Sequence, residues 1–177
     1  MRTALSIASV AILALMAASG TALAQGSGAE ARLKQLNITL PADSSPAANF
    51  VNSVQTGKLL FLSGNTPGGP WPLKGKVGKD LTVEQGYQSA RQTGLIMLSK
   101  VRTALGSLDR VKRIVKVLGM VNSADDFSDQ PKVVNGFSDL MVEVFGEGIG
   151  KHARSAVGMA GLPGNAPVEV EMIVEVE

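Results

Sequence analysis

The residues that could carry out chemistry in this chain are few, because it has no cysteine and a single histidine, His152. Without cysteine it has no thiolate nucleophile, no disulfide and no zinc–sulfur site. One histidine excludes metal sites built from several histidines, and His152 would have to be the base of any Ser/His/Asp arrangement. Chemistry must therefore come from carboxylates, arginines, hydroxyls or the backbone.

The densest group of carboxylates lies at the C-terminus, where Glu169, Glu171, Glu175 and Glu177 alternate with apolar residues over 168–177. A period of two predicts a strand with one apolar and one acidic face. Carboxylates in a row along one strand seldom converge on one ion, so we expect no metal site. Taken alone, these glutamates would be a solvated face and Arg154 an ordinary surface arginine.

Two β-rich runs between residues 50 and 63 flank Thr56-Gly57-Lys58, which predicts a hairpin. A loop rich in glycine and proline follows over 65–79. Thr82 and Gln85 have capping-box spacing, and apolar residues at steps of three and four then predict a helix that ends at Gly106.

The second half of the chain continues with a strand over 111–121, rich in β-branched residues. A second helix starts near Pro131, with Ser128 or Asp129 as its cap, and ends at Gly146. The resulting order β-β-α-β-α-β-β predicts an α+β two-layer sandwich, with both helices on one face of a mixed sheet. Because no helix is left for the other face, we expect self-association to cover it.

Several segments resemble the RidA/YjgF family, known for enamine/imine deaminases and for a subgroup labelled chorismate mutase-like or endoribonuclease L-PSP. They occur in family order and span roughly residues 47–177. The matching segments are Leu62-Ser63-Gly64, Asp109-Arg110-Val111-Lys112, Val121-Asn122-Ser123-Ala124-Asp125-Asp126-Phe127, Val134-Asn135, Ala153-Arg154-Ser155-Ala156-Val157, Leu162-Pro163 and Val168-Glu169-Val170-Glu171.

The resemblance implies a homotrimer with ligand clefts between subunits, no cofactor and no metal. It also implies hydrolytic deamination of 2-enamine or 2-imino acids to 2-keto acids and ammonia. By motif match, Arg154 binds the substrate carboxylate and Glu169 positions the attacking water as a general base. The backbone of Ala156 and Gly64 completes the ligand site, and Ser63 and Asn135 line the cleft.

The chain departs from the family at Phe50, which aligns with the family's tyrosine on the first strand. Phenylalanine keeps the ring but lacks the hydroxyl, so one hydrogen bond to a bound ligand would be lost, about 0.5–1.5 kcal/mol. Two simpler interpretations remain: Phe50 is a core residue like Phe137 and Phe145, and His152 is a satisfied surface histidine at the rim of the cleft.

Two other function classes stay open. The protein could be a non-catalytic periplasmic binding protein for small carboxylate metabolites, or it could be the endoribonuclease that the subgroup label suggests. Without Arg2 the chain has 16 basic and 15 acidic residues, and 4% of the residues are aromatic. This near-neutral balance argues against nucleic acid as a partner.

The N-terminus predicts export. Arg2, an apolar run over 4–18 and Ala22-Leu23-Ala24 form the pattern of a cleaved secretory signal peptide. The run is too short for a stable membrane anchor. We therefore expect a signal peptide over 1–24 and an N-terminal extension over 25–46, which frays over 25–31 and then forms a short helix through Leu33 and Leu36 that ends near Pro41. A single domain over 47–177 follows, and the protein should be periplasmic and secreted.

Overall fold

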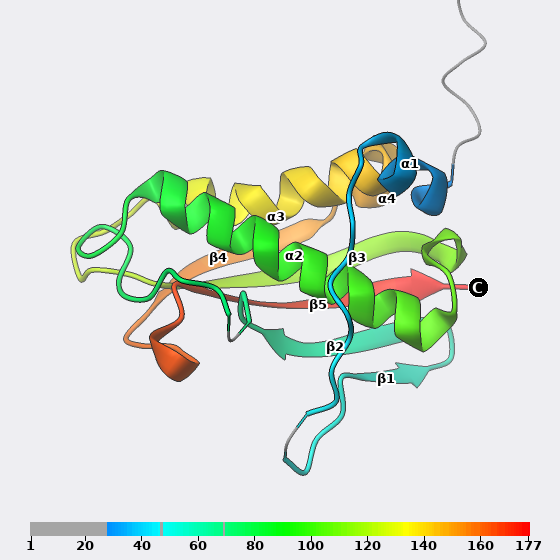
Figure 1. Ribbon diagram of the computed structural model, residues 1–177, viewed down its shortest axis with the longest axis horizontal. Helices are drawn as coiled ribbons and strands as arrows, with labels where there is room; N and C mark the ends of the chain where they lie inside the picture. The colour runs from blue at the N-terminus through cyan, green and yellow to red at the C-terminus, as the bar shows by residue number, and fades with distance from the viewer. Residues whose placement is uncertain (1–27, 47, 69) are drawn as a thin grey trace, which may run out of the picture.

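A computed structural model of the 177-residue chain describes residues 28–46, 48–68 and 70–177, in which two long helices cover one face of a five-stranded sheet (Figure 1). The strands are β1 (Ser53–Thr56), β2 (Leu59–Asn65), β3 (Val111–Asn122), β4 (Ala153–Met159) and β5 (Val168–Val176). The α-helices are α1 (Ala29–Gln35), α2 (Val83–Leu105), α3 (Gln130–Phe145) and α4 (Glu147–Gly150).

The sheet has the order β1-β2-β5-β3-β4. Its neighbouring strands are antiparallel except for β3 and β4, which are parallel and are connected through α3. The sheet is therefore mixed, and the predicted order of two strands, helix, strand, helix and two strands is confirmed, with α1 and α4 as short additions.

Local sequence signals set the ends of the main elements. At the start of α2 the Thr82 hydroxyl accepts a hydrogen bond from the Gln85 N–H, and the Gln85 side chain accepts one from the Thr82 N–H, as the capping box predicts. Gly106 ends α2 with a φ of 81°, and Gly57 turns the hairpin with a φ of 55°. Asp129 holds the N-cap position of α3 but makes no side-chain cap bond.

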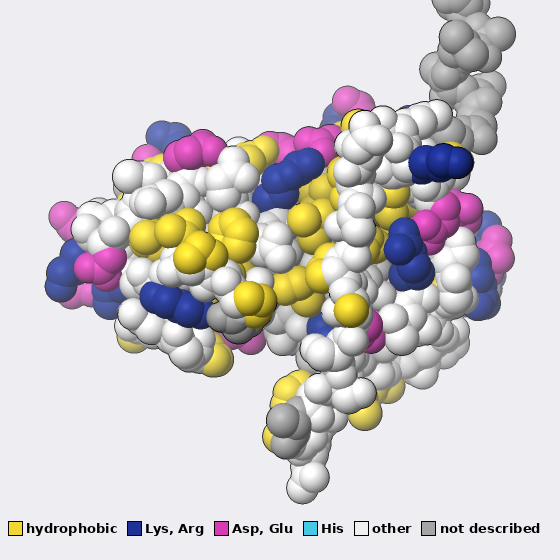
Figure 2. Space-filling view, in the orientation of Figure 1, with side chains coloured by type: hydrophobic (Ala, Val, Ile, Leu, Met, Phe, Trp, Pro, Cys, Tyr) yellow, Lys and Arg dark blue, Asp and Glu magenta, His cyan; other side chains and the backbone are white. Residues whose placement is uncertain are grey.

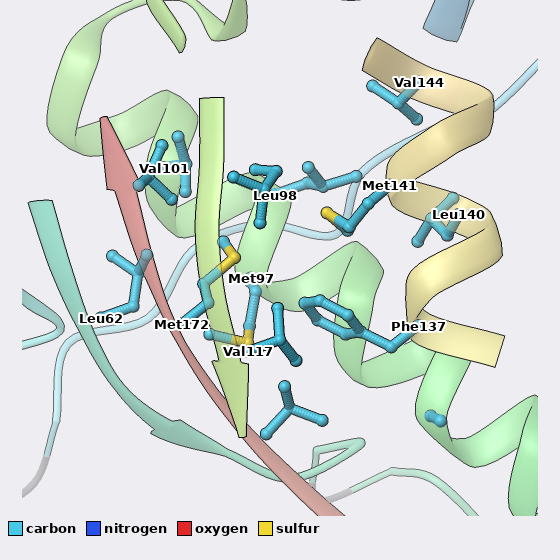
Figure 3. Close-up of a cluster of buried hydrophobic side chains, with 14 of the residues drawn as sticks. Leu62, Met97, Leu98, Val101, Val117, Phe137, Leu140, Met141, Val144 and Met172 are labelled. Carbon is cyan, nitrogen blue, oxygen red and sulfur yellow. The ribbon is translucent and has the colours of Figure 1, made fainter. Parts of the chain in front are cut away.

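The core lies between the sheet and the helices, where side chains from α2, α3 and three strands point toward one another (Figure 3). The apolar half of the C-terminal alternation faces this core: Val168, Val170 and Val174 are fully buried. A Cβ on Gly136 of α3 would overlap the Tyr87 carbonyl of α2, so this glycine allows the two helices to pack closely. The helix stripes and strand face predicted from periodicity are confirmed.

The predicted short helix through Leu33 is confirmed as α1, but it begins earlier than predicted. Residues 29–31, which we expected to fray, belong to α1, because Ala29 and Leu33 are buried and Glu30 accepts two hydrogen bonds from the Arg102 guanidinium at 2.6 and 3.0 Å. The chain then crosses α2 on its way to β1 (Figure 1), where the Ser99 hydroxyl donates to the Pro41 carbonyl.

The predicted signal peptide lies outside the described residues. None of the helices within 28–46, 48–68 and 70–177 is long and apolar enough to cross a bilayer. On the side of the molecule that shows the helices, basic and acidic side chains are interspersed and not gathered by sign (Figure 2).

Candidate functional site

Arg154 lies on β4, an edge strand of the sheet. It is in register with Val117 of β3, a fully buried core residue, so its side chain is on the face that carries the helices. There it meets α3: Nη1 donates to Asn135 Oδ1 at 2.8 Å and to Ser138 Oγ at 3.0 Å. Arg154 and Asn135, which were predicted separately as site residues, are therefore in direct contact.

The Arg154 guanidinium is a charge held by neutral groups. Among the described residues no carboxylate forms an ion pair with it, and its remaining contact is a long one of 3.5 Å from Nη2 to the Pro131 carbonyl. Both protons of Nη1 are used, whereas Nε makes no hydrogen bond within the described part of the chain. Nε and Nη2 present two parallel N–H groups, the edge that matches a carboxylate.

Ser138 is itself held by His152, which lies two residues before Arg154. His152 Nε2 is 3.1 Å from Ser138 Oγ, and Nδ1 is 2.7 Å from the Gly150 carbonyl oxygen. Burial lowers the pKa of His152, the Arg154 charge lowers it further, and the Gly150 carbonyl works in the opposite direction. Both ring nitrogens of His152 thus have hydrogen-bond partners, as the interpretation of a satisfied histidine requires. One of these partners is Ser138 of α3, which also accepts a hydrogen bond from Arg154.

Glu169 lies on the opposite face of the sheet. Its neighbours Val168 and Val170 face the core, so Glu169 points to the open face, where it is in register with Met120. Partial burial raises the pKa of the Glu169 carboxyl, and the neighbouring Glu171 raises it further. No described residue forms an ion pair with it, so nothing offsets these two effects, and the carboxyl holds a proton more readily than an exposed glutamate does.

Gly64 makes room for the Glu169 carboxylate. A Cβ at this position would collide with Glu169 Oε1, because an irregularity in the β2–β5 pairing after Leu62 brings the Gly64 backbone beside β5. Ser63 reaches the same region, but its hydroxyl donates to the Val51 carbonyl at 2.7 Å. The Ser63 side chain therefore fixes the segment before β1.

Phe50 is an exposed residue of that segment. Its exposed fraction is 57%, so the interpretation of Phe50 as core is wrong, whereas Phe137 and Phe145 are core residues. Lys100 of α2 anchors the segment to the helix, because its Nζ donates a hydrogen bond to Asn52 Oδ1 at 2.8 Å. The same ammonium contacts Asp43 Oδ1 and the Ser44 carbonyl, both at 3.1 Å, so the chain around Phe50 is tied to the core.

The candidate residues thus form two groups, which we call the Arg154 half-site and the Glu169 half-site. The Arg154 half-site consists of Arg154, Asn135 and Ser138, with the partly buried Ala156 on the same face of β4. The Glu169 half-site consists of Glu169 and Gly64, and it adjoins Ser63, the residue before Gly64 on β2, whose hydroxyl holds the segment that carries Phe50. Within one chain the two lie on opposite faces, with β3 between β4 and β5, a separation of at least ~10 Å from strand spacing alone.

Within the described ranges no three Asp, Glu or His side chains are grouped closely enough to hold a metal ion. The alternating glutamates of β5 instead form an acidic row on the open face, in which Glu169 is the member beside Gly64.

The fold defines a class: small α+β proteins with a mixed sheet covered by helices on one face. A family model described as "YjgF/chorismate_mutase-like, putative endoribonuclease" matches residues 29–176. The chain belongs to this family, and the predicted α+β fold of the chorismate mutase-like type is confirmed.

Its relatives carry different names. Protein TCP17 of Trypanosoma cruzi is 48% identical over 149 residues, which cover 82% of this chain and 92% of TCP17. A 2-iminobutanoate/2-iminopropanoate deaminase of Dermatophagoides farinae is 29% identical over 140 residues, 79% of this chain and 95% of that protein. A solved structure from Shewanella oneidensis, titled "putative endoribonuclease", has a TM-score of 0.80 at 30% identity, covering 85% of this chain and 100% of that one.

Sequence reasoning missed Ser138 and Lys100. Ser138 lies one helical turn after Asn135, a spacing that places both on one face of α3, and this signal was available. Lys100 falls within the buried part of α2, where a lysine gives no local sign of which acceptors will surround it.

Proposed function

We propose that this protein hydrolyses 2-imino acids, and the enamines in equilibrium with them, to 2-keto acids and ammonia. The observation that carries the proposal is the Arg154 guanidinium, whose Nε–Nη2 edge has no carboxylate partner among the described residues. A guanidinium stays charged at any physiological pH and binds carboxylates with two parallel hydrogen bonds. The family member named as a 2-iminobutanoate/2-iminopropanoate deaminase supports this choice of substrate.

The reaction needs one base, one water molecule and one anchor. Arg154 would bind the substrate carboxylate and so place the C2 carbon of the imine. The Glu169 carboxylate would take a proton from water as the water oxygen attacks C2, and then return that proton to the nitrogen. This gives a carbinolamine, and a second transfer through Glu169 would move its hydroxyl proton to the nitrogen as the C2–N bond breaks. Ammonia then leaves and a carbonyl remains, so imine and water are converted to keto acid and ammonia without a cofactor.

Because the two half-sites lie on opposite faces of one sheet, we infer that each complete site combines the Arg154 half-site of one copy with the Glu169 half-site of the next, in a homotrimer. Exposed apolar residues on the open face support self-association. They include Val54, Phe61 and Val157, with exposed fractions of 56, 40 and 39%. Burial of this surface between copies would enclose the Glu169 carboxylate.

A second candidate, a binding protein for small carboxylates without turnover, is favoured by one observation. Phe50 has no hydroxyl and the Ser63 hydroxyl is bound to the Val51 carbonyl, so Glu169 would have little help in holding water. RNA as a substrate is disfavoured by the near-neutral charge of the chain, which has 16 basic and 15 acidic residues besides Arg2, since RNA binding relies on concentrated positive charge.

Coupled turnover tests the proposal. An amino acid oxidase generates 2-iminopropionate from alanine, and the loss of the imine is followed with wild type, Arg154→Ala and Glu169→Gln. We expect acceleration by wild type and a loss of about 100-fold or more in both variants, the usual contribution of a general base. If wild type binds 2-oxobutanoate through Arg154 but does not accelerate imine loss, the binding protein replaces the enzyme.

We further propose that residues 1–24 are a signal peptide and that the protein is periplasmic. The apolar run and the Ala22-Leu23-Ala24 site support this. N-terminal sequencing of the protein from a periplasmic fraction should begin at Gln25, and a retained Met1 would contradict it.

A further inference from the structure

The hydrogen bonds around His152 determine which atom donates and which accepts at each step from the Gly150 carbonyl through His152 and Ser138 to Arg154. A carbonyl oxygen only accepts, so the 2.7 Å contact to the Gly150 oxygen places the ring proton on Nδ1. In a neutral ring Nε2 then only accepts, so the Ser138 hydroxyl donates to it across 3.1 Å. The lone pairs of Ser138 Oγ are left for Arg154 Nη1, at 3.0 Å.

This row of hydrogen bonds ends at Arg154, where it restrains the Nη1 side of the guanidinium. Nη1 donates its two protons to Ser138 Oγ and Asn135 Oδ1, residues one turn apart on α3. With Nη1 held at two points, rotation of the guanidinium is restricted, and the Nε–Nη2 edge faces one direction. This is the edge that the proposed function uses.

The surroundings of His152 favour the neutral ring that this row of hydrogen bonds requires. The imidazole is half-buried and its ring makes an edge contact with Phe137, with ring centroids 6.4 Å apart and an interplanar angle of 80°. The Arg154 charge also disfavours a second cation beside it. The Gly150 carbonyl lies only two residues before His152, so its contact with Nδ1 is local, and Gly150 itself packs so close to α3 that a Cβ there would overlap the Met141 backbone.

We propose that His152 and Ser138 are positioning residues, which hold the Arg154 guanidinium in the orientation that binds a carboxylate. The proposal deepens the proposed function and rests on it. Neither residue touches the substrate. Loss of either leaves Nη1 with one firm acceptor, so the guanidinium samples more orientations and binding of the carboxylate weakens, while the proton transfers at Glu169 are unaffected.

The single histidine allows a direct spectroscopic test. The full chain, purified without a histidine tag and labelled with ¹⁵N-histidine, contains one pair of ring nitrogens. At pH 7.5 we expect a protonated Nδ1 and an unprotonated Nε2, with the Nε2 signal moving in Ser138→Ala. A ring protonated at Nε2, or at both nitrogens, would overturn the proposal.

The second measurement is binding of 2-oxobutanoate, a keto acid with the carboxylate of the proposed product. Ser138→Ala and His152→Leu should each weaken binding roughly three- to tenfold, the effect of one hydrogen bond, and raise KM more than they lower kcat. Ser138→Thr keeps the hydroxyl and His152→Gln keeps an acceptor, so both should recover much of the affinity. Asp139→Asn, a neighbour on α3 that contacts Tyr87, is the matched control and should bind like wild type.

The outcomes separate this inference from the proposed function. If wild type binds 2-oxobutanoate and Ser138→Ala binds it equally well, the positioning role is wrong even though the site exists. If wild type neither binds nor turns over, the proposed function fails, and ¹⁵N relaxation of Arg154 Nε decides the positioning role. Greater Nε motion in Ser138→Ala than in wild type would support it, and equal motion would overturn it.

Discussion

Arg154 shows why an arginine and not a lysine suits this position. Two of its five N–H groups are bound to Asn135 and Ser138, and it still presents a pair of parallel donors. A lysine ammonium has three donors on one atom and cannot be held from one side while offering a flat edge on the other. The chemistry at this position therefore depends on the shape of the group as much as on its charge.

Arg154→Lys should consequently behave as a loss of function. We expect kcat/KM for 2-iminopropionate to fall by at least about tenfold, because charged hydrogen bonds contribute about 1.5–3 kcal/mol each and the second one is lost. Arg91→Lys, on the helix surface where Arg91 pairs with Glu143, is the control and should leave the rate unchanged. Equal activity of Arg154→Lys and wild type would argue against recognition by two parallel donors.

Glu169 leads to a prediction about pH. Burial and Glu171 raise the pKa of the Glu169 carboxyl, and a general base works only when deprotonated, so kcat/KM should fall with acidification at a higher pH than for an ordinary glutamate. Glu171→Gln removes one of the two causes and should move this acidic limb to lower pH. Glu175→Gln, further along β5, should not move it.

At the scale of elements, the contact between β2 and β5 shapes the Glu169 half-site. Gly64→Ala should reduce turnover about as strongly as Glu169→Gln, because the new methyl group would occupy the position of the carboxylate. Gly148→Ala, where an added Cβ meets nothing within 4 Å, is the matched control. Full activity of Gly64→Ala in the imine assay would show that the carboxylate has no fixed position beside Gly64.

The segment before β1 depends on Lys100 of α2 for its anchoring. Lys100→Met leaves Asp43 and Asn52 without their ammonium partner, and breaking a buried pair costs about 3 kcal/mol. Urea unfolding should report a loss of this size, with faster amide exchange over residues 43–52. Lys112→Met, which removes an exposed pair with Glu177, is the control and should unfold at the same urea concentration as wild type.

For the whole molecule, the opposite orientation of Arg154 and Glu169 allows a complementation test. Under the proposed function, Arg154→Ala and Glu169→Gln should each be inactive alone. If the protein is the proposed homotrimer, their subunits should form hybrid trimers after they are unfolded and refolded together. With one Arg154 and one Glu169 required at each interface, about a quarter of the sites would be intact. Activity that stays at zero in the mixture, with trimers present by sedimentation, would contradict a site shared between subunits.

Most of the fold could be predicted from the sequence because its signals are local. The capping box of Thr82 and Gln85, the glycine at 106 and the alternation over 168–177 act within one or two turns or along one strand, and each is found where predicted. Phe50 was harder to place. An isolated aromatic residue carries no periodicity, and its exposure depends on a segment tied to α2 through Lys100, far away in the chain.

The sequence by itself determined which groups this protein has for chemistry: no thiol, one imidazole, and an arginine and a glutamate in the motifs of its family. It also determined the elements that carry them, because hydrophobic periodicity and capping are properties of neighbouring residues. Only the tertiary structure decided that Arg154 faces α3 while Glu169 faces the other side of the sheet, because the orientation of a strand residue depends on the register with its neighbours. The tertiary structure also brought Ser138 next to His152 and Arg154, since α3 must pack against β4 before residues on these two elements can form hydrogen bonds.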